Sequence, residues 1–120
     1  MAKTILVVED SPTQMQMVKM ALQAGGYQVI TAFSGDEGLE KARSERPGLV
    51  VLDVVLPGRN GFQICRDLKR SPDTKDLPII LLTSRDQASD RFWGMKQGAD
   101  LYLTKPCNNA ELLAAVARYF

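Results

Sequence analysis

Histidine is absent from all 120 residues of the chain. This absence excludes a Ser-His-Asp hydrolase, a Cys-His nucleophile and a zinc centre with histidine ligands. Cysteine is scarce as well, because Cys65 and Cys107 are the only two and lie far apart in the sequence. We therefore expect two reduced thiols rather than a disulfide framework.

The sequence also lacks an excess of charge of one sign and long apolar runs. Fifteen Lys and Arg residues against fourteen Asp and Glu residues give a net charge of +1, which by itself indicates neither a nucleic-acid nor a membrane partner. No apolar run approaches the roughly 18 residues of a membrane span, and no signal-peptide core precedes the first apolar segment. We expect a cytoplasmic protein without membrane insertion.

Known nucleotide-binding and DNA-binding patterns are absent too. The sequence contains neither GxGxxG nor a Walker A loop, so a nucleotide site of either type is not predicted. It also lacks a basic helix that could enter a DNA groove. What remains is a chain with 45% hydrophobic residues, which is the composition of a globular domain.

Short apolar segments alternate with helix-start signals along the chain. Ser or Asn precedes Gln or Glu by three residues at each of four helix starts, which is the pattern of a capping box. The four pairs are Ser11 with Gln14, Ser34 with Glu37, Asn60 with Gln63, and Asn108 with Glu111. The expected strands are residues 4–8, 28–32, 48–52, 78–83 and 101–104, and the expected helices are 12–24, 34–44, 60–70, 87–97 and 108 onward.

Strands separated by helices of about ten residues indicate βαβ units and a parallel sheet. A continuous apolar strand such as "GLVVL" at 48–52 fits a sheet that is covered on both faces. We therefore predict an α/β protein with a (βα)5 doubly wound, flavodoxin-like fold and strand order 2-1-3-4-5. We expect a single domain over residues 1–120, without an output domain.

Polar residues follow the apolar strands at their carboxyl ends. Glu9 and Asp10 follow the first predicted strand, Asp53 the third and Lys105 the fifth, while Thr83 ends the fourth. In a doubly wound sheet these ends meet at one edge, where the strand order reverses and ligands bind. Three neighbouring carboxylates raise one another's pKa unless a cation is present, and oxygen ligands without His or Cys suit Mg²⁺ or Mn²⁺.

A metal ion, a lysine and a hydroxyl group around a carboxylate form a site for a phosphoryl group. An aspartate can itself be the nucleophile and form an acyl phosphate. Asp53 is the best candidate for this role, because Glu9 and Asp10 form a natural metal-holding pair.

These motifs resemble those of the CheY-like receiver domains of two-component response regulators, over the whole length of the chain. The resemblance rests on the acid pair Glu9-Asp10, on "LDVVLPGRNG" around Asp53, on "LLTS" and on "GADLYLTKP". The segments "EDSPTQ" and "FWGMKQGADLYLTKP" further resemble PilH-type regulators of type IV pilus motility and phototaxis.

The resemblance implies a role for each residue of the acidic edge. Asp53 would accept a phosphoryl group from the phosphohistidine of a CheA-like histidine kinase. Asp10 and Asp53 would bind Mg²⁺ directly together with the backbone carbonyl of Val55, and Glu9 would act mostly through a metal-bound water. The domain would assist its own phosphorylation and dephosphorylation without being an enzyme in the usual sense.

The resemblance also implies a switch. Thr83 would move toward the phosphoryl group, Tyr102 would swing inward into the space that Thr83 leaves, and Lys105 would pair with the phosphoryl group. The Lys105–Pro106 bond would be cis. The surface formed by the fourth helix, the fifth strand and the fifth helix would then control a downstream partner.

Three other functions compete with a phosphorylated output regulator. An aspartyl-nucleophile hydrolase usually carries a second acid two residues after the nucleophile, but Val55 occupies that position. A constitutive interaction module would not need the acidic residues, Thr83 or Lys105. A phosphate sink for another regulator would use the same chemistry as an output switch.

The helix at 87–97 carries an apolar stripe and a tryptophan. Ala88, Phe92, Met95 and Ala99 recur at helical spacing, so we expect them to face the core. Trp93 lies one position off this stripe. It is either a contact for a partner, since Trp is enriched at binding hot spots, or it packs at the edge of the stripe.

Overall fold

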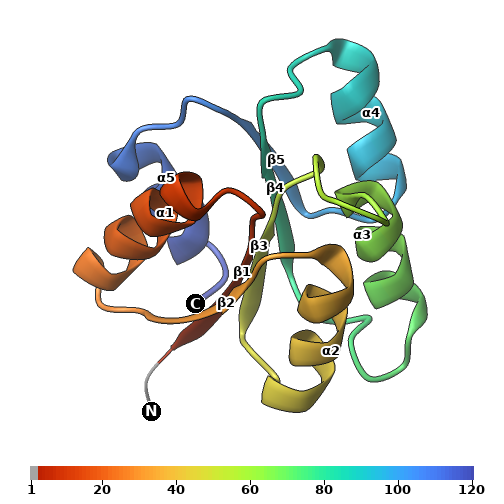
Figure 1. Cartoon of the computed structure of the whole chain (residues 1–120), viewed down its shortest axis with the longest axis horizontal. Coiled ribbons are helices and arrows are strands. Elements are labelled where there is room, and N and C mark those ends of the chain that lie inside the picture. Colours follow the sequence, from red (N-terminus) through yellow and green to blue (C-terminus); the bar gives the residue numbers. More distant parts are fainter. Residues whose placement is uncertain (1–2) are drawn as a thin grey trace.

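The computed structural model describes residues 3–120, in which five strands and five helices alternate (Figure 1). The strands are β1 (Thr4–Val8), β2 (Gln28–Ala32), β3 (Leu49–Leu52), β4 (Ile79–Thr83) and β5 (Leu101–Thr104). The helices are α1 (Pro12–Ala24), α2 (Gly35–Glu45), α3 (Gly61–Arg70), α4 (Ala88–Lys96) and α5 (Asn109–Ala117). The strands form one parallel sheet in the order β2-β1-β3-β4-β5, which confirms the predicted fold class.

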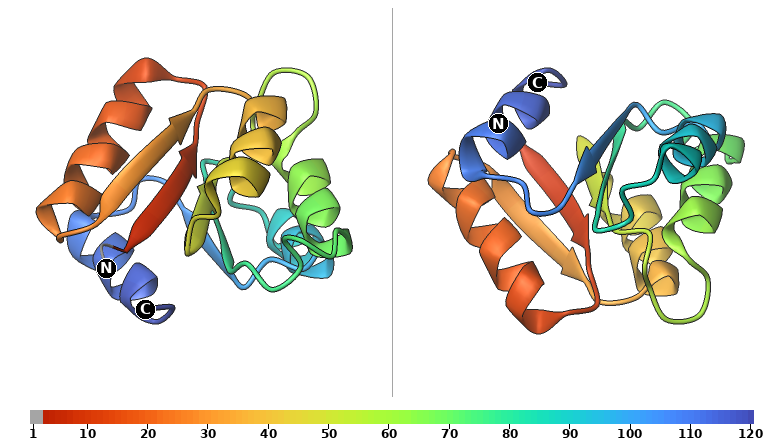
Figure 2. Two further views of the ribbon diagram at one scale, coloured as in Figure 1. Left: turned by 90° about the horizontal axis from the view of Figure 1, so that it is seen from below. Right: turned by 90° about the horizontal axis from the view of Figure 1, so that it is seen from above.

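Helices cover both faces of the sheet. Helices α1 and α5 lie on one face, and α2, α3 and α4 lie on the other (Figure 2). Successive side chains of a strand point to opposite faces, so Ile5 and Val7 pack toward α1 and α5 while Leu6 and Val8 pack toward α2 and α3. This double coverage explains why the central strands are apolar at every position apart from Thr4 at the start of β1 and Thr83 at the end of β4. No helix in the described range is long and apolar enough to cross a bilayer.

The predicted caps hold the amino ends of four helices, but only one of the four predicted pairs forms the reciprocal capping box. The cap oxygens of Ser11, Ser34, Asn60 and Asn108 accept from the backbone N–H groups of Gln14, Glu37, Gln63 and Glu111. Only the Gln63 side chain returns the contact, by accepting from the Asn60 N–H at 3.0 Å. The Glu37 carboxylate instead accepts from the N–H of Phe33 at 2.7 Å.

The predicted core stripe of α4 is wrong. Phe92 is 65% exposed and Met95 is 44% exposed, while Ala88 is exposed at the start of the helix. Ala99 is buried, but it lies beyond the end of the helix. The apolar residues do recur at helical spacing, but those within α4 lie on its solvent-facing side instead of the side that faces the core.

Gly94 is the buried residue of α4, and it explains the error. A Cβ atom at this position would lie 2.8 Å from Cδ1 of Leu81 and 3.0 Å from the ring of Tyr102. The helix therefore approaches β4 and β5 through a residue without a side chain, which a hydrophobic pattern does not reveal. Trp93, next to Gly94, is 48% exposed, so both alternatives for this side chain stay predictions.

The orientation of α4 predicts that replacing phenylalanine by alanine has a small effect on stability at Phe92 and a large one at Phe62. Phe92→Ala should change the free energy of unfolding by less than about 0.5 kcal/mol, because the side chain is largely in water. Phe62→Ala should cost about 3 kcal/mol, because Phe62 is buried among the residues of α2 and α3. Urea unfolding of both variants measures this difference, and equal losses would contradict the exposed position of Phe92.

Candidate functional site

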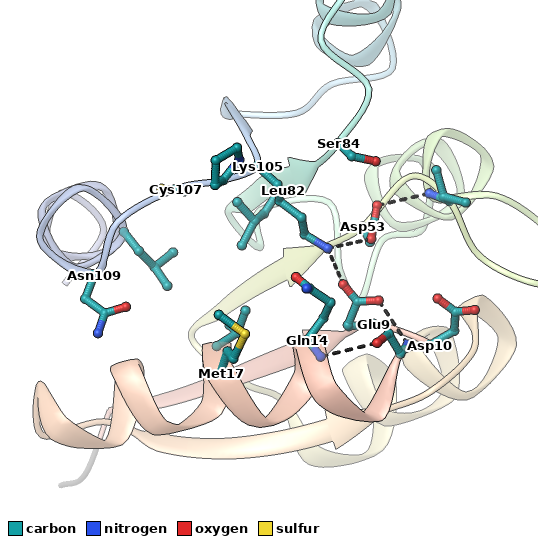
Figure 3. Close-up of a pocket in the computed structure, with 15 residues that line it drawn as sticks. Glu9, Asp10, Gln14, Met17, Asp53, Leu82, Ser84, Lys105, Cys107 and Asn109 are labelled. Atoms are coloured by element: carbon teal, nitrogen blue, oxygen red, sulfur yellow. Dashed lines mark hydrogen bonds and ion pairs between the residues drawn. The ribbon is translucent and has the colours of Figure 1, made fainter.

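Three charged side chains meet at the carboxyl edge of the sheet (Figure 3). Glu9 follows β1, Asp53 follows β3 and Lys105 follows β5. The Lys105 Nζ donates to Oδ2 of Asp53 at 2.9 Å and also pairs with Oε1 of Glu9. Glu9 is only 4% exposed and Asp53 only 7%, so one ammonium group bridges two buried carboxylates.

Backbone hydrogen bonds fix these three residues to the strand ends. The N–H of Asp53 donates to the carbonyl of Val8 at 3.0 Å, and the N–H of Lys105 donates to the carbonyl of Thr83 at 2.8 Å. The N–H of Glu9 similarly donates to β2. The sheet pairing thus continues past the last apolar residue of each strand and holds the charged side chains at the edge.

Burial and the bridging lysine act in opposite directions on the acids. Burial raises the pKa of Glu9, and this effect exceeds that of the hydrogen bonds from Lys105 and from the N–H of Ser11. Burial also acts to raise the pKa of Asp53, but the bonds from Lys105 and from the N–H of Val55 prevail and keep that pKa below its ordinary value. Asp53 therefore keeps its negative charge at neutral pH although its carboxylate is buried.

Lys105 responds in the complementary way. Burial acts to lower the pKa of its ammonium group, but the hydrogen bonds to Glu9 and Asp53 are stronger in effect and raise that pKa. Lys105 therefore keeps its positive charge although its side chain is mostly buried. A fixed cation beside a charged aspartate is suited to binding an incoming anion.

Asp10 completes the set of acidic residues that could hold a metal ion at this edge. Asp10 is exposed and lines the same cavity as Glu9, Asp53 and Val55. Within residues 3–120, no three Asp, Glu or Cys side chains are already grouped as a metal site, and the Lys105 ammonium group lies between Glu9 and Asp53. The donors are nevertheless all oxygens at one edge of the sheet, which fits a hard divalent cation such as Mg²⁺.

Thr83 and Tyr102 are buried together next to this edge. The Thr83 hydroxyl accepts from the N–H of Arg85 at 3.4 Å, and the Tyr102 hydroxyl donates to the carbonyl of Arg85 at 2.7 Å. The Tyr102 ring is already inward here, so its inward position does not require Thr83 to leave. The guanidinium of Arg91 lies 5.1 Å from the ring centroid and donates to the carbonyl of Tyr102.

The loop after Asp53 is held by two contacts that sequence analysis did not identify as functional. A Cβ atom on Gly61 would lie 2.1 Å from the carbonyl oxygen of Asp53, so the start of α3 packs directly against the Asp53 backbone. Arg59 bridges α2 and α3 by donating to Asp36 and to Asp67, each at 2.6 Å. Gly61 ends the segment "PGRNG", whose proline and glycines are typical of a turn. In contrast, no sequence pattern points to the two partners of Arg59.

Two further features concern residues next to Lys105 and Asp53. The Lys105–Pro106 peptide bond is cis, as the resemblance implied. Val55 points its side chain outward, and its N–H donates to Oδ1 of Asp53 at 3.1 Å. The structure thus brings together Glu9, Asp53 and Lys105, with Asp10 and the backbone of Val55 at the rim and Thr83 beneath.

A doubly wound sheet with a buried aspartate, an acid pair and a bridging lysine at its carboxyl edge defines the CheY-like class of signalling domains. The sequence pattern of the response regulator receiver domain matches residues 5–117, and the chain belongs to this family. It is therefore a receiver domain of two-component signalling, a signalling domain rather than an enzyme in the usual sense.

Individual relatives agree with this assignment. The chain is 44% identical to the protein PilH of Pseudomonas aeruginosa over 112 residues, which cover 93% of each chain. The chemotaxis protein CheY4 of Vibrio cholerae has a similar structure, with a TM-score of 0.93 and 33% identity over the full length of both chains. A receiver domain of a sensor histidine kinase of Pseudomonas aeruginosa has a TM-score of 0.92 and 28% identity, covers 99% of this chain and 98% of its own, and carries magnesium in its active-site cleft.

The bridging role of Lys105 predicts a loss of stability that depends on metal. Lys105→Met should lower the free energy of unfolding by about 3 kcal/mol at neutral pH in a chelator, because two buried carboxylates would face each other without a cation. Adding Mg²⁺ should recover part of this loss. Urea unfolding with chelator and with Mg²⁺ measures both effects.

Lys69→Met is the matched control. Lys69 is similarly buried, but its single carboxylate partner, Asp100, is more exposed. We expect a smaller loss that Mg²⁺ does not change. Equal losses at both lysines, or no response of Lys105→Met to Mg²⁺, would contradict the bridging role.

Proposed function

We propose that this receiver domain is a phosphorylatable switch that accepts a phosphoryl group on Asp53 from a CheA-like histidine kinase. One observation carries the proposal: Asp53 is a buried carboxylate, and an ammonium group 2.9 Å away keeps its pKa below the ordinary value. This arrangement provides a charged nucleophile and, beside it, a cation that can bind the transferred group.

The chain's own residues divide the work of the transfer. A carboxylate oxygen of Asp53 would form a bond to phosphorus while the bond from phosphorus to the histidine nitrogen of the kinase breaks, and that nitrogen would keep the electron pair. The Nζ of Lys105 would balance the charge that develops on the phosphoryl oxygens. Glu9, Asp10, Asp53 and the carbonyl of Val55 would hold Mg²⁺. When bound, the ion neutralises negative charge on the acids and on the phosphoryl group.

The switch would run through Thr83, Arg85 and Tyr102. Thr83 and Tyr102 both bond to the backbone of Arg85, so a shift of the Thr83 hydroxyl toward a phosphoryl group alters the anchor of the Tyr102 ring. Arg85 also donates to Asp90 near the start of α4 at 3.0 Å. This chain of contacts supports α4, β5 and α5 as the responding surface, with a local charge change biasing a two-state element.

The exposed apolar side chains of α4 support a protein partner at this surface. Phe92, Trp93 and Met95 are all exposed on a short helix, and aromatic residues of this kind are common binding anchors. The similarity to PilH supports a role in pilus-related motility or taxis. We predict that the chain acts in the cytoplasm as a single receiver domain without an output domain. A role as a phosphate sink is the alternative prediction.

Intact mass measurement tests the phosphoacceptor. After incubation with Mg²⁺ and acetyl phosphate, we expect a gain of one phosphoryl group, about 80 Da. The gain should vanish in Asp53→Asn, which keeps the size of the side chain but lacks the nucleophilic carboxylate, and it should vanish in a chelator. An equal gain in Asp53→Asn would refute the assignment of Asp53, and no gain in the wild type would favour the constitutive interaction module.

Amide NMR tests the switch. Beryllofluoride with Mg²⁺, which mimics a phosphorylated aspartate, should shift amide resonances from Thr83 to Lys105 more than those of α2. Thr83→Ala should reduce the shifts in α4 and retain those next to Asp53, because it removes the hydroxyl that links the two regions. Shifts confined to the neighbours of Asp53 in the wild type would contradict this route.

A further inference from the structure

The cavity at Asp53 extends well beyond the acidic edge. It has a volume of about 540 Å³ and extends from the charged residues to side chains of α1 and α5 (Figure 3). Its charged half contains Glu9, Asp10, Asp53 and Lys105. The other half is lined mainly by Met17, Val18, Leu82, Cys107 and Leu112.

The second half is apolar and comes from three separate elements. Met17 belongs to α1, Leu82 to β4 and Leu112 to α5, while Cys107 lies in the segment between β5 and α5. Figure 3 shows the side chain of Met17 pointing from α1 toward Leu82. Met17 is 61% exposed, and its unbranched side chain can adapt to a bound group.

The size of the cavity exceeds what a phosphoryl group requires. Its volume falls within the roughly 300–1,000 Å³ range of small-molecule sites, whereas phosphoryl transfer to Asp53 uses only the charged end. The apolar half adjoins the charged half, so it can receive an apolar group attached to a phosphoryl group that is bound beside Lys105.

We propose that the apolar half binds the leaving group of a small acyl phosphate, and that the chain prefers donors whose acyl group is a hydrocarbon or aromatic body. The proposal rests on the function proposed above. In the transfer, an oxygen of Asp53 forms a bond to phosphorus while the bond from phosphorus to the acyl oxygen breaks. The acyl group leaves as a carboxylate with the electron pair of that bond, and no proton is transferred.

The order of polar and apolar residues along the cavity supports an acyl phosphate as the occupant. The phosphoryl end meets Lys105, and Asn109 at the start of α5 lines the far part of the cavity. The apolar side chains between these two positions match the hydrocarbon body of the donor. A donor without such a body, such as acetyl phosphate, would leave the apolar half largely unused.

The test compares benzoyl phosphate with acetyl phosphate as donors to Asp53. For each variant, the ratio of the two phosphorylation rates is measured by intact mass in Mg²⁺, and dividing by the wild-type ratio removes the intrinsic reactivity of the donors. Met17→Ser should lower the ratio by roughly fourfold, the factor that corresponds to losing contact with about one methylene group. Met17→Leu should retain most of the wild-type ratio.

Met20→Ser is the matched control. Met20 lies on the same helix and is 58% exposed, but it does not line the cavity, so its ratio should equal that of the wild type. An unchanged ratio in Met17→Ser, or an equal fall in Met20→Ser, would overturn the inference while leaving the phosphoacceptor role intact. Phosphorylation by neither donor in the wild type would refute the proposed function itself.

Discussion

The ion bridge from Lys105 to Glu9 and Asp53 is the contact on which the site depends. Glu9 and Lys105 lie 96 positions apart in the chain, and β4 separates β5 from β3, so the lysine must reach across about 10 Å, or two strand spacings. The long lysine stem and the Asp53 side chain together cover this distance, and the charged end of the lysine stays between the carboxylates. The site therefore exists only when β1, β3, β4 and β5 are in register.

Helix α4 buries little side-chain surface against the sheet. It approaches β4 and β5 through Gly94, and its amino end is tied to the preceding loop by the pair of Arg85 with Asp90. Its large apolar side chains point to solvent instead of contributing to the core. An element with little buried apolar surface opens or shifts at low cost in free energy, which is the property that a responding surface needs.

Much of the fold and part of the site could be predicted from residue pattern, because these features depend on neighbours in sequence. Strands and caps follow local chemistry, and Asp53 and Lys105 were identifiable because polar residues at the carboxyl ends of parallel strands must converge. The apolar spacing of α4 misled because a glycine, not a hydrophobic stripe, makes its closest contact. The anchoring of Arg59 and the placement of Arg91 over Tyr102 depend on three-dimensional neighbours that no spacing encodes.

The bridge also explains how a change at Asp53 can reach the opposite side of the site. In the proposed switch, a phosphoryl group would add negative charge to Asp53 and so strengthen its attraction for Lys105 relative to that of Glu9. The backbone of Lys105 is bonded to the carbonyl of Thr83, so the pull is carried to the end of β4 as well as along β5. Both strands lead to Arg85 and Tyr102, whose hydrogen bond joins the site to the base of α4. In the proposed switch, Lys105 would thus link the charge at Asp53 to the strand ends that hold it, and those strand ends would determine which surface responds.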